Sequence, residues 1–112
     1  MKLLHPDPGQ IELPLVLAAL SDPTRLSIIR QLAEDGESMC RRLDFASKSN
    51  LSYHFAKLRE AGITRTRIEG TARYISLRRD DLDARFPGLL DSVITAAAAY
   101  PRIMEAEPVN GK

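Results

Sequence analysis

Hydrophobic positions in the first third of the chain recur at helical spacing and predict three consecutive helices. Residues 11–20 are unusually apolar and predict the first helix. Ser21 or Asp22 can cap a second helix, with a proline in its first turn, and this helix is expected to end near Gly36. A short third helix is expected over 38–44.

The next segment has one apolar and one polar face. Leu51, Phe55 and Leu58 recur at i, i+4 and i+7, which predicts a helix from Ser47 to Gly62 with one buried side. Polar side chains point away from that side or lie on its flanks. They are Lys48, Ser49, Asn50, Ser52, Tyr53, His54 and Lys57. Such a face can donate hydrogen bonds to phosphates and base edges in a DNA groove.

Two stretches rich in β-branched and aromatic residues, 63–68 and 71–77, flank Glu69-Gly70 and predict a β-hairpin. Three arginines lie near its turn: Arg65, Arg67 and Arg73. They are expected to neutralise phosphates or to enter the adjacent minor groove. The polar helix and the hairpin together therefore predict a DNA-binding surface.

A helical pattern returns after the hairpin, is interrupted at Pro87-Gly88 and continues to Tyr100. This last helix and the first are more apolar than one protomer requires, which predicts a homodimer with a two-fold axis. The expected interface residues are Leu13, Val16, Leu17, Leu90, Ile94 and Ala97. Two recognition helices would then read half-sites about 34 Å apart in an inverted-repeat operator. The alternative is that both apolar stripes pack within one chain.

Composition bounds the organisation of the chain. With 112 residues, of which 44% are hydrophobic, it is long enough for one packed domain, expected over 10–100 between a flexible arm, 1–9, and a tail, 101–112. No apolar run approaches the ~18 residues that span a bilayer, and the arm has prolines where a signal peptide needs apolar residues. A cytoplasmic protein without membrane contact is expected.

The net charge of +1 conceals an uneven distribution. Residues 47–79 contain eight basic and two acidic residues, whereas the rest of the chain contains eight basic and thirteen acidic ones. A neutral protein with one strongly basic third is typical of a polyanion-binding surface.

The order of elements and three segments resemble the winged helix-turn-helix repressors of the ArsR/SmtB family. The segments are ALSDPTRL at 19–26, SKSNLSYHFAKLREAG at 47–62 and RTRIEG at 65–70. The resemblance covers residues 11–99 and implies a mainly α fold with a small β-hairpin wing that dimerises through its first and last helices. It also implies a sequence-specific DNA-binding regulator, expected to be a repressor, that a signal releases from double-stranded DNA.

The signal is not expected to be a metal, although repressors resembling this family often respond to metals. Cys40 is the chain's single cysteine, Arg41 and Arg42 would repel a cation, and residues 80–101 contain no histidine. We expect no metal site and no cofactor. The two arginines and a helix start favour a Cys40 thiolate, which makes this residue a candidate redox sensor whose oxidation would end in an intersubunit or mixed disulfide. The alternative is a buried cysteine that serves as a small apolar residue.

Competing functions receive less support from the sequence. An enzyme would need Cys40 with His5 or His54 as a base, yet neither histidine has a recognisable catalytic setting and there is no Gly-rich phosphate loop, so no enzymatic activity is expected. Two alternatives stay open: a regulator induced by a small ligand between the subunits, and a protein-interaction module that does not bind DNA. The arginine-rich hairpin and the polar helix favour DNA binding.

Overall fold

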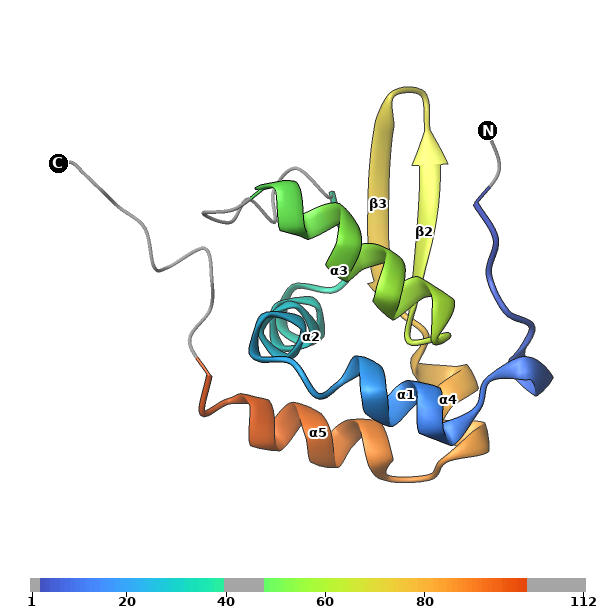
Figure 1. The fold of residues 1–112 in the computed structure, drawn as a ribbon, viewed down its shortest axis with the longest axis vertical. Coiled ribbons are helices and arrows are strands. Elements are labelled where there is room, and N and C mark those ends of the chain that lie inside the picture. Colours follow the sequence, from blue (N-terminus) through green and yellow to red (C-terminus); the bar gives the residue numbers. More distant parts are fainter. Residues whose placement is uncertain (1–2, 40–47, 101–112) are drawn as a thin grey trace, which may run out of the picture.

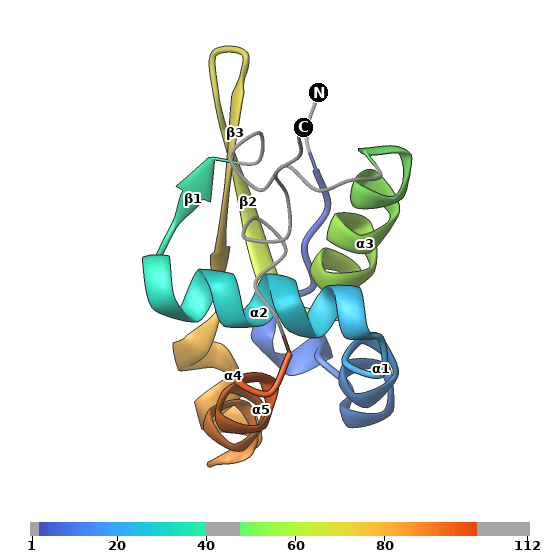
Figure 2. The same ribbon diagram turned by 90° about the vertical axis from the view of Figure 1, so that its left-hand side faces the viewer.

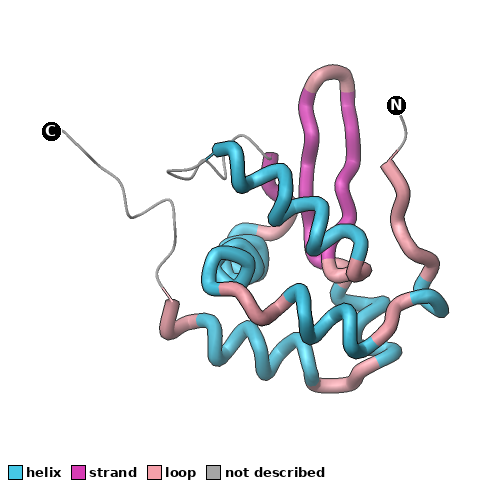
Figure 3. Tube along the Cα trace, in the orientation of Figure 1, coloured by secondary structure: helices cyan, strands magenta, loops and turns pink. Residues whose placement is uncertain are grey.

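The computed structural model describes residues 3–39 and 48–100 (Figure 1). The elements in chain order are η1 (Pro8–Gln10), α1 (Leu13–Ala19), α2 (Pro23–Asp35), β1 (Ser38–Met39), α3 (Lys48–Glu60), β2 (Thr64–Glu69), β3 (Ala72–Leu77), α4 (Arg79–Arg85) and α5 (Leu89–Ala97). The helices form the body, and the hairpin of β2 and β3 projects beyond them (Figures 2 and 3). This arrangement is the winged helix-turn-helix fold that the sequence predicted.

The ends of α2 and α3 follow from local sequence. The Asp22 carboxylate accepts a hydrogen bond from the Arg25 backbone N–H at 3.1 Å and caps α2, as predicted. Gly36 follows α2 with φ +77° and donates to the Leu32 carbonyl at 2.8 Å. Gly62 follows α3 with φ +85°, and a Cβ there would lie 2.5 Å from Cγ1 of Ile11. Glycine at 62 is therefore required by both conformation and space.

The sheet corrects one sequence prediction. Its antiparallel strands have the order β1-β3-β2, and Ser38 pairs with Ile75 while Met39 pairs with Tyr74. A helix had been predicted over 38–44, but its first two residues form a strand, because β3 offers backbone partners along the edge not covered by β2. Residues 40–44 of that prediction lie outside the described part of the chain.

One hydrophobic core joins the helices to the hairpin. Its fully buried large apolar side chains come from α1, α2, α3, β3 and the segments next to them: Ile11, Val16, Ile28, Ile29, Leu32, Leu58, Ile63 and Ile75. Leu51 and Leu58 of α3 are buried and Phe55 packs partly against them, which confirms the predicted apolar face of this helix. Helix α5 packs against α2, and α1 packs against α3. The core therefore fixes the position of α3 relative to the wing.

The N-terminal segment contacts the body of the protein through His5 and Pro6. It runs beside β2, the free edge of the sheet (Figure 1). The Thr66 backbone N–H donates to Nε2 of His5 at 3.0 Å, and the Arg78 guanidinium donates to the Pro6 carbonyl at 2.8 Å. An edge strand has unpaired backbone groups, and His5 satisfies one of them.

Candidate nucleic-acid interface

Helix α3 has an outer face that is free of core contacts. Ser52 and Lys57 are exposed, and Tyr53 retains 56% of its accessible surface. Lys48 and two further predicted contacts, Ser49 and Asn50, lie in the first turn of the same helix, but their side chains are outside the described part. Ser52, Tyr53 and Lys57 are thus accessible to a partner, and their role as DNA contacts stays a prediction.

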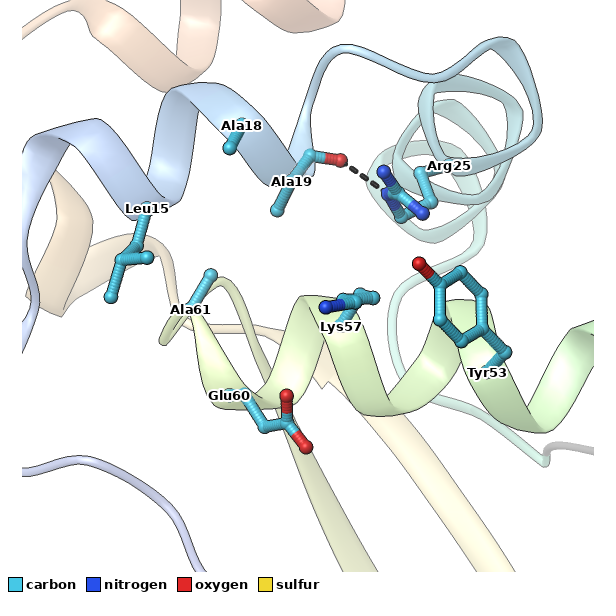
Figure 4. A pocket seen from close by; sticks show the side chains of 8 residues that line it. All are labelled: Leu15, Ala18, Ala19, Arg25, Tyr53, Lys57, Glu60 and Ala61. Atoms are coloured by element: carbon cyan, nitrogen blue, oxygen red, sulfur yellow. Dashed lines mark hydrogen bonds between the residues drawn. The ribbon is translucent and has the colours of Figure 1, made fainter.

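His54 occupies a different position from the DNA surface predicted for it. It is only 8% exposed, and its Nδ1 lies 3.0 Å from an Nη1 atom of Arg25. Because arginine only donates, we assign Nδ1 as the acceptor and the proton to Nε2. Arg25 also donates from Nε to the Ala19 carbonyl at 2.5 Å (Figure 4). His54 therefore connects α3 to the start of α2, and its place at the edge of the apolar stripe was the signal for this role.

Tyr53 and Lys57 border a pocket between α3 and α1 (Figure 4). The Lys57 ammonium lies 5.4 Å from the centroid of the Tyr53 ring, within range of a cation–π contact. The pocket encloses about 300 Å³, and Leu15 of α1 contributes to its opposite wall. Tyr53 and Lys57 therefore border open space on the α1 side of α3.

The three predicted wing arginines lie on two faces of the hairpin. Side chains alternate along a strand, and Thr66 of β2 pairs with Ile75 of β3. Arg73 lies on the same face of β3 as Ile75 and therefore faces α3. Arg65 and Arg67 lie on the opposite face of β2. Arg73 lines a cavity together with residues of α3.

Arg67 and Arg65 are held by carboxylates. Both carboxylate oxygens of Glu37 accept from Arg67, at 2.9 and 3.2 Å, and Glu69 accepts at 2.6 Å. The carboxylates raise the pKa of Arg67, and the Arg67 hydrogen bond lowers the pKa of Glu37. The Arg67 guanidinium also lies 4.5 Å from the centre of the Tyr74 ring. Arg65 lies 3.5 Å from Asp81.

A second cavity, the α3–wing cleft, separates α3 from the hairpin and encloses about 310 Å³. Its lining residues are Leu3, Ser52, Phe55, Ala56, Arg59, Thr66 and Arg73. Sequence reasoning missed Arg59, which lies two turns after Ser52 on one side of α3. The seven-residue spacing places Ser52 and Arg59 on one side of the helix. The sequence alone does not show that the hairpin lies opposite that side.

The predicted dimer residues divide into buried and exposed sets. Val16, Leu90 and Ala97 are buried within the protomer, and Ile94 is half-buried. Leu13 and Leu17 are exposed on α1, and their neighbour Leu15 is exposed as well. Val16, Leu90 and Ala97 therefore pack within one chain, which was the alternative to a dimer interface for these residues.

The remaining candidate chemistry concerns Cys40, which lies outside the described residues. Within the described ranges, no group of three His, Cys, Asp or Glu side chains converges as a metal site would require. No helix in the same ranges has the length and apolar character needed to cross a membrane.

Comparisons with known proteins agree with this geometry. Residues 20–67 match a family described as a helix-turn-helix domain. The uncharacterised HTH-type transcriptional regulator YceK of Bacillus subtilis is 40% identical over 82 residues, which are 70% of this chain and 82% of YceK. The arsenic resistance transcriptional regulator ArsR1 of Pseudomonas putida is 34% identical over 85 residues, 70% of this chain and 66% of ArsR1. An uncharacterised HTH-type regulator of Methanocaldococcus jannaschii is 41% identical over 59 residues, half of this chain and 66% of that protein. This chain therefore belongs to the helix-turn-helix transcriptional regulators and is similar to their ArsR-type members, as its sequence motifs indicated.

Proposed function

We propose that this regulator is a repressor that binds duplex DNA with the outer face of α3 and the β2–β3 wing. The proposal rests on the difference between the buried and the exposed side of α3. Leu58 and His54 attach one side of the helix to the core and to α2, which leaves Ser52, Tyr53 and Lys57 exposed. A recognition helix needs such a rigidly held but unoccupied face.

Among the wing arginines, Arg73 is the primary phosphate contact in this proposal. It is exposed and lies on the α3 side of the hairpin. Arg65 and Arg67 would first have to leave their carboxylates. Exposed ion pairs are weak, and Arg65 has one carboxylate partner whereas Arg67 has two, so a DNA phosphate should displace Asp81 from Arg65 more easily than both partners from Arg67.

The test is a fluorescence-anisotropy titration of duplex DNA at several salt concentrations. Lys57→Gln and Arg73→Gln should each weaken binding to all sequences and reduce the slope of log K against log salt by about 0.9 for the lost phosphate contact. Arg79→Gln is the matched control, because Arg79 is an exposed arginine on α4 that pairs with Asp91 at 2.8 Å. Slopes that stay at the wild-type value in both variants would exclude this surface.

A homodimer is part of the same proposal. The exposed leucines of α1 are its strongest support, since apolar side chains such as Leu17, which is 49% exposed, gain from burial against a second copy. Leu17→Asp should therefore shift sedimentation toward the monomer and weaken binding to an inverted repeat. Leu4→Asp is the control, because Leu4 is even more exposed but lies outside α1. A wild-type monomer at micromolar concentration that still binds the repeat tightly would overturn the dimer.

The redox signal rests on sequence alone. Cys40 lies between β1 and α3 in the chain, beside Arg41 and Arg42, which favour a reactive thiolate. We propose that peroxide weakens operator binding of the wild type but not of Cys40→Ser. An equal response of both proteins would instead favour the alternative, a small ligand bound between the subunits.

A further inference from the structure

The α3–wing cleft has one apolar and one cationic side. Leu3 of the N-terminal segment and Phe55 of α3 supply apolar surface, while Ser52, Arg59 and Arg73 supply hydrogen-bond donors. The described lining residues include no carboxylate. Its volume of about 310 Å³ is at the lower end of the range of small-molecule pockets, which begins near 300 Å³.

Arg59 and Arg73 differ from the arginines around them. Four neighbouring arginines have carboxylate partners: Arg65, Arg67, Arg78 and Arg79. Neither Arg59 nor Arg73 has an ion-pair partner among the described residues, and Nε of Arg59 is buried without a hydrogen-bond acceptor. A buried donor without an acceptor is destabilising, so an anionic group that reached Arg59 would relieve that cost.

The surroundings of His5 indicate a positive potential beside the cleft. The pKa of His5 is lowered, first by burial and then by the positive charges of Arg59, Arg78 and Arg65. His5 accepts from the backbone of Thr66, which lines the cleft. The same field that disfavours a proton on His5 favours a negative charge within the cleft.

We infer that the α3–wing cleft binds a small organic anion, with a carboxylate or phosphate group toward Arg59 and Arg73 and an apolar or aromatic body against Phe55 and Leu3. An inorganic ion would satisfy the arginines but leave the apolar side uncovered. A neutral aromatic molecule would cover that side but leave the arginines without an anion. The pocket therefore selects for both features in one ligand.

The first experiment titrates the full-length protein with benzoate in the absence of DNA and follows backbone amide shifts by NMR. Benzamide and inorganic phosphate are the comparison probes, since each has only one of the two features. We expect saturable shifts at residues of the cleft with benzoate and at least tenfold weaker binding of each comparison probe. Absence of saturation, or equal affinity for phosphate and benzoate, would overturn the inference.

Three variants locate the site. Arg73→Gln removes an exposed cation and Ala56→Leu fills the cleft without changing charge, and both should weaken benzoate binding at least fivefold. Arg59→Gln should have a similar or larger effect. Arg79→Gln, on α4, removes an equal charge away from the cleft and should leave the affinity unchanged. An equal loss in Arg79→Gln would mean that benzoate responds only to net charge and would overturn the site.

A consequence of this site rests on the proposed function, because Ser52 and Arg73 belong both to the cleft and to the proposed DNA surface. A bound anion should compete for Arg73 and lower DNA affinity in the wild type but not in Ala56→Leu. Separate measurements test the anion site and the DNA-binding surface. DNA binding without benzoate tests the proposed function, and benzoate binding without DNA tests the cleft. Benzoate that saturates the cleft while DNA affinity stays constant would overturn the competition.

Discussion

Replacement of His54 by leucine should loosen the attachment of α3 to α2 without removing a group that faces DNA. Arg25 is buried, and its guanidinium donates to two acceptors among the described residues: the His54 ring at 3.0 Å and the Ala19 carbonyl at 2.5 Å. Leucine fills similar space but offers no acceptor, so one charged donor remains unpaired. We expect the free energy of unfolding to fall by about 2 kcal/mol, within the 1–3 kcal/mol typical of such losses.

His54→Asn is the matched variant, because its amide oxygen can replace Nδ1 as an acceptor for Arg25. It should retain part of the stability that His54→Leu loses, and urea unfolding measures both differences. With both variants fully folded, a positioning role predicts weaker DNA binding with an unchanged salt slope, whereas a phosphate contact predicts a smaller slope. Wild-type stability of His54→Leu would refute the assigned role of the Arg25–His54 hydrogen bond.

Three further predictions concern neighbouring features. Gly62→Ala should lower the free energy of unfolding by more than the roughly 1–2 kcal/mol of a left-handed residue, because the new Cβ meets Ile11; urea unfolding at or near the wild-type midpoint would contradict this. Because the pKa of His5 is lowered, the unfolded chain takes up a proton more readily, so stability should fall as pH drops below 6.5 and this dependence should weaken in His5→Gln. Glu37→Gln should release Arg67 and strengthen DNA binding at low salt, and an unchanged affinity would show that Glu69 alone holds it.

The local features of the fold were predictable because their causes lie within a few residues. The sequence predicted a cap at Ser21 or Asp22 and helix ends near Gly36 and Gly62 from the residues beside each end, and the structure confirms Asp22 as the cap and both ends. Strand β1 was not predictable in the same way. Ser38 pairs with Ile75, which is distant in the chain, and a two-residue strand leaves no periodic pattern.

The site was predictable as a set of elements but not as a set of contacts. Alternation along β2 and β3 already separates Arg73 from Arg65 and Arg67. Which face meets α3 depends on tertiary packing, so the sequence did not show that Arg73 and Arg59 share a cleft. His54 illustrates the same limit, because its partner Arg25 belongs to another helix.

Folding also redistributes the charge that indicated a polyanion-binding surface. The basic segment 47–79 has an excess of six positive charges in sequence, but acidic residues from outside it pair with several of its arginines. Glu37 contacts Arg67, Asp81 contacts Arg65 and Arg78, and Asp91 contacts Arg79. Among the residues whose side chains the structure describes, the basic groups of this segment without a carboxylate partner are Lys57, Arg59 and Arg73. All three are on α3 or on the wing face that meets it. Because electrostatic attraction falls off within a Debye length of about 8 Å, these three groups rather than the segment total should determine where an anion binds.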